Sequence, residues 1–299
     1  MMVRVAPDAR TPGSGAPSLA ALRAGQEVEL VAACTRKERL VARSGTAYLA
    51  LELRDRSGTM PARAFRDADV LAGRFERGDL VRVRGRVERF RDELQLDVLA
   101  IERATAADPA DFLPVAYRDL DELDGFLEHL AREVHDRDLR GLLDRLLGDA
   151  ALRAQWRRAP CTRGGHHAYL GGLLEHTVAV AQLALETCVL HPRLNSDLLI
   201  AAALVHDLGK TREFTYGAEI GLSDEGRLLG HEALGVQIVE AHAGDLPADK
   251  RVALAHCVLT HHGTHAGRRF GLPEAVALQR LNALDASVKA VLEHGLGAQ

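Results

Sequence analysis

Histidine and aspartate side chains gather in the C-terminal half of this 299-residue chain. In chain order they are His176, His206, Asp207, His231, His261, His262 and Asp285. Imidazole nitrogens and carboxylate oxygens are ligands that divalent transition metals prefer, and the set is large enough for two ions. Eleven of the fourteen histidines lie between His166 and His265, which a random scatter would not produce. The pattern predicts metal-assisted hydrolysis.

The doublet His206-Asp207 follows the apolar segment 198–205. Two polar residues at the core-facing end of a helix cost several kcal/mol unless they are satisfied, and a bound cation would satisfy both. Consecutive helical residues point about 100° apart, so we expect His206 to bind one ion and the shorter Asp207 to bridge two. With Asp207 shared, the first expected site takes His176, His206 and Asp285, and the second takes His231, His261 and His262.

A hydroxide held between two ions roughly 3.5 to 4 Å apart is nucleophilic at neutral pH, and the same ions neutralise phosphoryl oxygens during in-line displacement. The set therefore predicts hydrolysis of a phosphodiester or a phosphomonoester. Asp207 and Lys210 are the candidate catalytic residues. Lys210 follows His206 by one helical turn and could hold a phosphate oxygen or stabilise charge in the transition state. Its structural alternative is a cation that matches the negative end of a helix.

Helices must position these side chains, because apolar residues recur at three and four spacing through this half of the chain. The spacing predicts a helical connector over 120–147 and, after Pro160, an all-helical bundle. The expected helices of the bundle cover 173–190, 197–208, 229–242, 250–261 and 273–294.

The N-terminal part of the chain instead has the pattern of short strands. The expected strands cover 28–35, 48–55, 59–66, 80–89 and 94–101, with one short helix over 68–75. Five strands with a helix between the third and the fourth are typical of an OB-fold barrel. Such barrels commonly bind single-stranded nucleic acid or sugars.

The expected strand 80–89 places valines on one face and Arg82, Arg84 and Arg86 on the other. Exposed arginines are normal on the outer face of a barrel, and solvation is the favoured interpretation for the barrel alone. A downstream phosphodiesterase site adds weight to a phosphate track. Tyr48, Phe65 and Phe90 are candidates for stacking on bases, although each could equally belong to the core.

Composition and charge exclude some classes of protein. The formal net charge of −4 argues against coating of nucleic acid by bulk charge, so a polyanion would need a local basic patch. The four cysteines are far apart without a Cys-x-x-Cys pair, which predicts neither a disulfide framework nor a thiolate zinc site and favours the cytoplasm. No apolar run approaches the ~20 residues needed to cross a bilayer, so we expect no membrane partner.

The ligand set resembles that of the HD-domain superfamily of metal-dependent phosphohydrolases, whose signature is a histidine, a His-Asp doublet and a distal aspartate. The added histidines resemble the members with a two-metal site. The segment 166–177, HHAYLGGLLEHT, together with HDLGK at 206–210 and HHG at 261–263, is similar to the YhaM-type 3′→5′ exoribonucleases. That family also places an OB-fold before its HD domain. The resemblance covers roughly residues 25–290.

The resemblance implies an exonuclease that removes nucleotides from the 3′ end of single-stranded RNA, or also of DNA, with the barrel guiding the strand. It implies two divalent metal ions, with Mn2+ favoured and Fe2+, Co2+ or Mg2+ as alternatives. His166 and His167 could contact the substrate phosphate or merely cap the helix. The thin set of aromatic residues in the barrel shifts the expected strand contacts towards Arg82, Arg84 and Arg86.

The predicted fold class is a multi-domain protein, with an N-terminal all-β OB-fold barrel followed by an all-α HD-domain helical bundle. The expected parts are a flexible tail over 1–18, an OB-fold nucleic-acid-binding domain over 19–108, a helical connector over 109–160 and an HD phosphohydrolase domain over 161–299. Two other functions stay open: hydrolysis of small or cyclic nucleotides, and a nucleic-acid-binding regulatory protein that keeps metal for stability only. A homo-oligomer is also left open.

Overall fold

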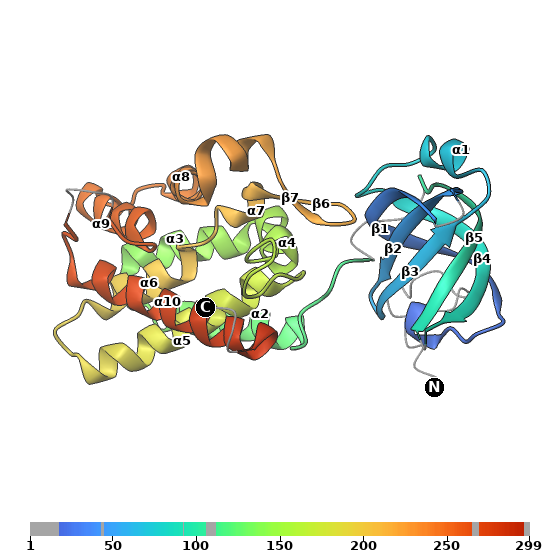
Figure 1. The fold of residues 1–299 in the computed structure, drawn as a ribbon. Coiled ribbons are helices and arrows are strands. Elements are labelled where there is room, and N and C mark those ends of the chain that lie inside the picture. The colour runs from blue at the N-terminus through green and yellow to red at the C-terminus, as the bar shows by residue number, and fades with distance from the viewer. Residues whose placement is uncertain (1–17, 43–44, 92, 106–111, 265–268, 296–299) are drawn as a thin grey trace, which may run out of the picture. The chain divides into compact units, whose positions relative to one another are not determined.

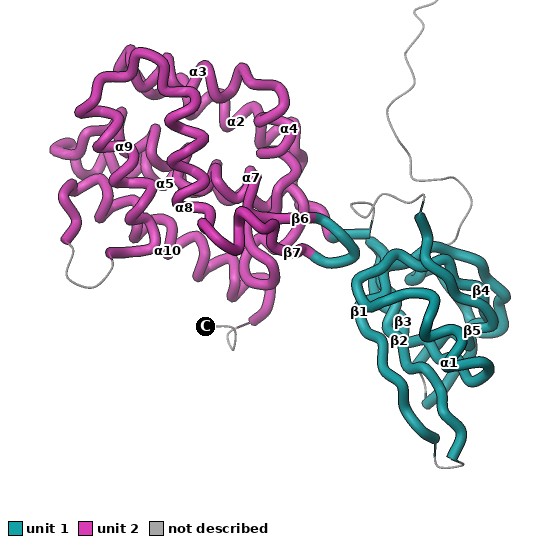
Figure 2. Tube along the Cα trace, turned by 90° about the horizontal axis from the view of Figure 1, so that it is seen from above, with its two compact units in different colours: residues 1–113, 216–219 teal, residues 114–215, 220–299 magenta. Residues whose placement is uncertain are grey.

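The computed structural model describes residues 18–42, 45–91, 93–105, 112–264 and 269–295. Residues 1–17 of the expected N-terminal tail lie outside the described residues. The chain divides into two compact units (Figure 2). Unit 1 comprises residues 1–113 and 216–219, and unit 2 comprises residues 114–215 and 220–299.

Unit 1 contains a closed five-stranded barrel (Figure 1). Its strands are β1 (Glu27–Val41), β2 (Ala47–Asp55), β3 (Gly58–Ala64), β4 (Leu80–Phe90) and β5 (Glu93–Arg103), with the short helix α1 (Ala68–Ala72) between β3 and β4. The strand order is β1-β2-β3-β5-β4, in which only the β3–β5 pairing is parallel. The predicted OB-fold barrel, with five strands and one helix, is confirmed.

Long, bent strands close this barrel. β1 pairs with β4 through its first half and with β2 through its second half, so one strand joins both sides of the sheet. A register shift between Arg84 and Gly85 bends β4 against β5, as bulges do in barrels. A side chain at Gly85 would collide with the Asp97 carbonyl oxygen. Inside, Val81, Val83 and Val87 of β4 are fully buried, as their alternation predicts.

Unit 2 is a helical bundle with one small hairpin (Figure 1). Its helices are α2 (Leu120–Arg132), α3 (Arg137–Gly148), α4 (Ala150–Arg158), α5 (Gly172–Leu190), α6 (Ser196–Val205), α7 (Lys210–Glu213), α8 (Asp224–His242), α9 (Ala248–Thr260) and α10 (Pro273–His294). The hairpin strands are β6 (Phe214–Tyr216) and β7 (Ile220–Leu222). The predicted helical fold of this half is confirmed. The hairpin has no counterpart in the sequence-based prediction, because strands of three residues show no periodicity.

Helix α6 lies at the centre of the bundle. All eight residues from Leu198 to Val205 are buried, and the helix packs against α5, α9 and α10 as well as α2 and α3. Its N-terminus is capped by Asn195, whose side-chain oxygen accepts the Leu198 N–H at 3.1 Å. The helix ends at Val205, so His206 and Asp207 are delivered into the core of unit 2.

The three helices of the predicted connector belong to the same bundle. α2 and α4 pack against α5, and α3 packs against α6 and α8. Each of the three begins at an aspartate whose carboxylate accepts two backbone N–H groups, at Asp119, Asp136 and Asp149. Helices α2, α3 and α4 are therefore part of unit 2.

Helix α8 begins five residues before its predicted start. The Ser223 hydroxyl accepts the Gly226 N–H at 2.8 Å and starts a helical turn at Asp224. Gly230 then interrupts the helix with φ 72°, in the left-handed region that glycine tolerates. The helix is interrupted at Gly230 and resumes at His231. The apolar pattern of the sequence did not predict this kink.

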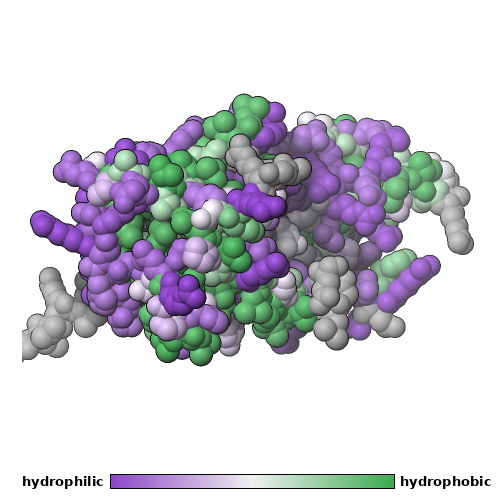
Figure 3. Space-filling view, turned by 90° about the vertical axis from the view of Figure 1, so that its left-hand side faces the viewer, coloured by the Kyte–Doolittle hydropathy of each residue, from purple (hydrophilic) through white to green (hydrophobic). Residues whose placement is uncertain are grey.

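Among the described residues, α5 is long and apolar enough to cross a membrane by length and composition, which corrects the expectation that no apolar run approaches that length. Half of this helix is buried inside the protein, as in a core helix, and its buried residues include Glu175 and His176. In the face that Figure 3 shows, hydrophobic patches lie between hydrophilic side chains. Exposed apolar residues of α10 include Leu284, Val288 and Leu292.

Candidate metal centre

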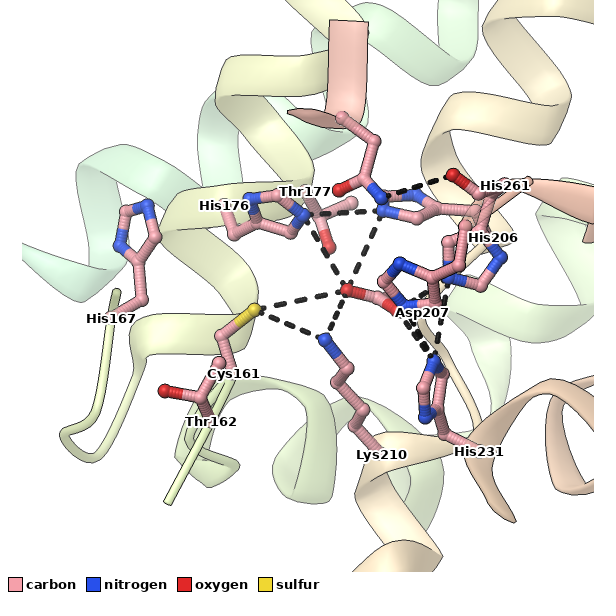
Figure 4. A network of polar contacts seen from close by, with 12 residues as sticks. Cys161, Thr162, His167, His176, Thr177, His206, Asp207, Lys210, His231 and His261 are labelled. Carbon is pink, nitrogen blue, oxygen red and sulfur yellow. Dashed lines mark hydrogen bonds and ion pairs between the residues drawn. The ribbon is translucent and has the colours of Figure 1, made fainter. Parts of the chain in front are cut away.

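The seven predicted ligand residues come together in unit 2. Figure 4 shows five of them, namely His176, His206, Asp207, His231 and His261. Five elements supply them: His176 comes from α5, His206 and Asp207 from the end of α6, His231 from α8, His261 and His262 from the end of α9, and Asp285 from α10. Residues separated by up to 109 positions in the sequence thus become neighbours. Asp207 lies between two groups of histidines.

The two oxygens of Asp207 face different groups. Oδ2 lies 3.4 Å from His176 Nε2 and 3.5 Å from His206 Nε2, and these three residues are almost completely buried. Oδ1 lies 3.2 Å from His261 Nε2 and 3.5 Å from His231 Nε2. The carboxylate therefore has the arrangement expected of a bridge between two cations.

The spacing of the nitrogens fits metal ligation. Two imidazoles bound to one tetrahedral ion at about 2.0 to 2.1 Å place their nitrogens roughly 3.3 Å apart. In the first group, His176 Nε2 and His206 Nε2 are 3.2 Å apart. In the second group, His231 Nε2 lies 3.4 Å from His261 Nε2 and 3.1 Å from His262 Nε2.

The proton positions also point to an ion. His206 Nδ1 lies 2.8 Å from the Ala203 carbonyl and His261 Nδ1 lies 2.6 Å from the Val258 carbonyl, so each Nδ1 carries the proton and each Nε2 presents a lone pair. Among the described residues, no hydrogen-bond donor reaches the buried Asp207 Oδ1. Lone pairs that face each other without a donor repel, and a bound cation removes this repulsion. The residues present fit a pair of divalent ions.

Two carboxylates stand behind the histidines. Asp285 Oδ2 lies 2.6 Å from His176 Nδ1, on the ring nitrogen that faces away from Asp207. Glu213 Oε1 lies 3.2 Å from His231 Nδ1 and accepts the His231 backbone N–H as well. Such contacts fix the tautomer and the orientation of a metal-binding histidine. In this position Asp285 can orient the His176 ring, and its expected direct ligation of an ion stays a prediction. The position of Glu213 beside His231 was not predicted.

Lys210 is buried beside the first group. Its Nζ lies 2.7 Å from Asp207 Oδ2 and 3.3 Å from Cys161 Sγ. Burial alone would lower the pKa of Lys210, but the Asp207 carboxylate and the Cys161 thiol together hold it above its ordinary value. Burial alone would raise the pKa of Asp207, but Lys210 and His206 contribute to holding it well below its ordinary value. Lys210 forms an ion pair with Asp207, and its expected contact with a phosphate oxygen stays a prediction.

His166 and His167 have different surroundings, although both were candidates for substrate contact. The His167 ring is buried, with Nε2 3.0 Å from Asp285 Oδ2 and Nδ1 2.9 Å from the Tyr169 hydroxyl. Both of its ring nitrogens are therefore engaged inside the protein. His166 is half-buried, with Nε2 3.8 Å from Cys161 Sγ, and burial first of all lowers the pKa of His166 to about 4.

Glycines let the backbone approach at two points of the centre. A Cβ on Gly172 would collide with the His167 carbonyl, which explains part of the Gly-Gly-Leu-Leu-Glu-His block. A Cβ on Gly209, two residues after Asp207, would collide with the His231 carbonyl oxygen. The close approach at Gly209 brings α8 against α7 and holds the second histidine group near Asp207.

The two histidine groups differ in their access to solvent. His176 and His206 of the first group are 0% exposed. In the second group, His231 is half-buried and His262 is exposed. The second group is therefore the more accessible to solvent.

On the barrel, the three predicted aromatic residues lie together. The rings of Tyr48 and Phe65 are stacked, with centroids 5.2 Å apart. The Arg63 guanidinium lies over both Tyr48 and Phe90, at 5.7 Å and 5.0 Å from the ring centroids. Phe65 and Phe90 are each 43% exposed. We call Tyr48, Arg63, Phe65 and Phe90 the aromatic cluster; the sequence did not single out Arg63.

The three arginines of β4 are exposed, but acidic residues face them across the sheet. In the register, Arg86 is opposite Glu27 and Asp97, Arg84 is opposite Glu29, and Arg82 is opposite Glu102. Arg82 Nη1 also lies 3.5 Å from Glu29 Oε1. Directly opposite side chains share one face of a sheet. The expected cationic stripe is therefore interspersed with acidic residues, which the sequence of β4 alone does not reveal.

Comparison with known proteins agrees with both units. An HD-domain model matches residues 173–291, which include all seven ligand residues, and a model of an OB-fold nucleic acid binding domain matches residues 28–104. The chain therefore contains an OB-fold domain followed by an HD domain. This HD-domain chain is 28% identical over 284 residues to the 3'-5' exoribonuclease YhaM of Listeria monocytogenes, covering 90% of this chain and 89% of that protein.

The protein of the same name from Shouchella clausii is 27% identical over 89% of this HD-domain chain and 85% of its own length. The resemblance to YhaM-type proteins that the motifs indicated is thereby confirmed. Among solved structures, the second OB-fold domain of replication protein A from Methanococcus maripaludis matches 31% of this chain and 97% of its own, at 18% identity and a TM-score of 0.25.

Proposed function

We propose that this protein is a metal-dependent 3′→5′ exonuclease that hydrolyses the phosphodiester bonds of single-stranded RNA. The observation that carries the proposal is the division of the Asp207 carboxylate between two histidine groups, with Oδ1 left without a donor among the described residues. The names of the YhaM relatives support the choice of RNA and of the 3′ end.

Each group has a defined task in this proposal. His176, His206 and Asp207 Oδ2 would hold one ion, while Asp207 Oδ1 and the three histidines of the second group, His231, His261 and His262, would hold the other. Bound divalent ions supply an activated water and neutralise the phosphoryl oxygens. Asp285 and Glu213 keep the lone pairs of His176 and His231 directed inward. Lys210 keeps Asp207 ionised.

The proposed metal is Mn2+, with Fe2+ or Co2+ next and Mg2+ last. Five imidazoles and one shared carboxylate make up the two groups. Imidazole suits transition metals, whereas Mg2+ prefers oxygen ligands and retains several waters. A nitrogen-rich centre therefore favours the transition metals.

The aromatic cluster of the barrel is the proposed contact for the strand. Exposed rings bind bases by stacking, and a guanidinium between two rings can also meet the phosphate backbone. The arginines of β4 are a weaker candidate, because Glu27, Glu29 and Glu102 lie opposite them in the sheet.

Metal-free protein, prepared with EDTA, tests the proposal on single-stranded RNA labelled at its 5′ end. Addition of Mn2+ should restore stepwise shortening from the 3′ end with release of mononucleotides. An RNA whose 3′ end is base-paired serves as the control and should resist. Cleavage from the 5′ end, turnover of small nucleotides without degradation of RNA, or binding without turnover would each contradict the proposal.

A further inference from the structure

A third set of ligand atoms lies beside the first histidine group. Cys161, His166 and His176 each offer one such atom, and the three atoms lie within 4.8 Å of one another. Figure 4 shows the Cys161 sulfur directed towards Asp207 and Lys210. None of the tasks proposed above uses Cys161 or His166.

The distances within this set match those of a metal site that contains a thiolate. A tetrahedral ion at about 2.3 Å from sulfur and 2.05 Å from nitrogen separates these two atoms by roughly 3.6 Å. Cys161 Sγ lies 3.8 Å from His166 Nε2 and 3.7 Å from Asp207 Oδ2. The distances from the sulfur to this nitrogen and to this carboxylate oxygen are therefore close to those between two ligands of one ion.

The loop that carries the cysteine and the histidine is closed on itself. The Cys161 N–H donates to the His167 carbonyl at 3.1 Å. The Thr162 hydroxyl donates to the His166 carbonyl at 2.8 Å and accepts the Gly165 N–H at 2.9 Å. These bonds fix the spacing of Cys161 and His166 before any ion arrives.

Cys161 differs from the other buried cysteine of unit 2. Cys257 is fully buried on α9. Cys161 instead contacts an ammonium at 3.3 Å, a carboxylate and an imidazole. A thiol that only fills space is found among apolar atoms, so the surroundings of Cys161 indicate a role for its sulfur.

We propose that Cys161, His166 and His176 form a third cation site, which takes a thiophilic divalent ion such as Zn2+. On binding, the thiol proton leaves to water and the sulfur becomes a thiolate ligand. The Lys210 ammonium remains against this sulfur, and the Asp207 carboxylate balances its charge. This inference goes beyond the proposed exonuclease function. The sequence did not indicate such a site, because the histidine partners of Cys161 become visible only in the fold.

His176 gives the third site a consequence. The same imidazole belongs to the first group with His206 and Asp207. An ion held by Cys161 and His166 therefore competes for a ligand of the hydrolytic centre. Thiophilic ions should inhibit the enzyme at this point, while oxygen-preferring ions such as Mg2+ should ignore it.

Absorption spectroscopy with Co2+ tests the site without any activity assay. Metal-free, full-length protein is titrated with Co2+, and the sulfur-to-cobalt charge-transfer band is followed in the near ultraviolet. We expect the band in the natural protein and in the matched control Cys257→Ser, and its loss in Cys161→Ser. His166→Gln should shift or weaken the band, and this variant keeps the test valid if Cys161→Ser fails to fold. Absence of the band in the natural protein, or its survival in Cys161→Ser, overturns the proposal.

A second measurement examines the competition for His176, and it rests on the proposed exonuclease function. Zn2+ is added to the Mn2+-loaded enzyme, and inhibition is expressed relative to the uninhibited rate of each variant. Cys161→Ser should raise the inhibitory Zn2+ concentration at least about tenfold, and Cys257→Ser should not. Equal inhibition of both variants contradicts the competition, whereas the cobalt band reports on the site even if RNA is not the substrate.

Discussion

The metal centre and the β4 face of the barrel both concentrate ionisable residues, but they satisfy them differently. On the barrel, Arg82, Arg84 and Arg86 meet acidic side chains across the sheet. In the metal centre, imidazole lone pairs face one another and Asp207 Oδ1 lacks a donor among the described residues. Charged groups that have partners within the protein do not require a bound ligand. Buried groups without them indicate a ligand, and this distinction separates the candidate site from a charged surface better than residue type does.

The largest expected effect follows from Asp207→Asn. The amide keeps the shape of the side chain but loses the charge that two groups share, so we expect activity to fall by about a thousandfold or more. Metal content, measured by mass spectrometry on the same sample, should fall with it. The exposed Asp245→Asn is the control and should be unaffected. If Asp207→Asn kept both its metal and its activity, the difference between the metal centre and the β4 face of the barrel would not hold.

The orienting carboxylates should matter less than Asp207. Glu213→Gln and Asp285→Asn each remove a charge that holds a histidine, and metal affinity should fall about 10- to 100-fold. Calorimetric titration with Mn2+ should show that Glu213→Gln weakens one of two binding events and leaves the other. Glu232→Gln, next to His231 on α8, is the matched control. Equal losses at both binding events would argue against separate groups.

Variants of the barrel test its two candidate surfaces directly. Phe90→Ala and Arg63→Ala disturb the aromatic cluster and should weaken binding of single-stranded RNA by at least about 1 kcal/mol, roughly fivefold. Arg84→Ala should cost less than about 1 kcal/mol, because Arg84 is an exposed charge that lies opposite Glu29 in the sheet. Fluorescence anisotropy with a labelled strand measures both, and Leu99→Ala on β5 is an apolar control. If Arg84→Ala has the larger effect, the β4 face is the binding face.

The smallest effect on activity is expected where a charge inside unit 2 has partners. The Asp124 carboxylate contacts the guanidinium groups of Arg153 and Arg157 at 2.8 Å. Asp124→Asn should leave RNA degradation unchanged and lower the free energy of unfolding by about 1 to 3 kcal/mol. Chemical denaturation measures this loss, and reduced activity of the folded variant would contradict the assignment.

The contribution of Asp124 should also depend on pH. Burial alone would raise the pKa of Asp124, but Arg153 and Arg157 outweigh it and lower the pKa below its ordinary value. A depressed carboxyl pKa stabilises the fold fully above the unfolded value of about 3.9, and this contribution is lost as the pH falls towards the folded value. The difference in stability between the natural protein and Asp124→Asn should therefore be constant near neutrality and shrink below about pH 4. A difference in stability that grows as the pH falls would contradict this prediction.

Much of the candidate site could be predicted, because its residue types carry their own signal. Histidine is rare enough that His176, His231 and the doublets stand out from apolar helices, and they do converge. The roles of Glu213 and Cys161 could not be predicted, since each depends on a contact across the fold. Asp285 was singled out, but which nitrogen of His176 it meets depends on how α10 packs against α5.

For the fold, too, local sequence patterns could be interpreted, whereas contacts between distant segments could not be predicted. The alternation of Val81, Val83 and Val87 was sufficient to predict β4 as a strand with one buried face. It was not sufficient to predict that Glu27 and Glu29 lie opposite the arginines, because this depends on pairing with a strand about fifty residues earlier. The kink at Gly230 could not be predicted either, since an isolated glycine is compatible with a continuous helix.

The close approach at Gly209 has a consequence for saturation mutagenesis. Any side chain there would push α8 away from α7 and carry His231 out of reach of Asp207. Gly209 should therefore be as intolerant of replacement as a ligand, although it has no atom that binds or reacts. In a deep mutational scan, depletion at Gly209 would report the spacing between two backbones, and only the metal content of the purified variants would tell it apart from depletion at His206.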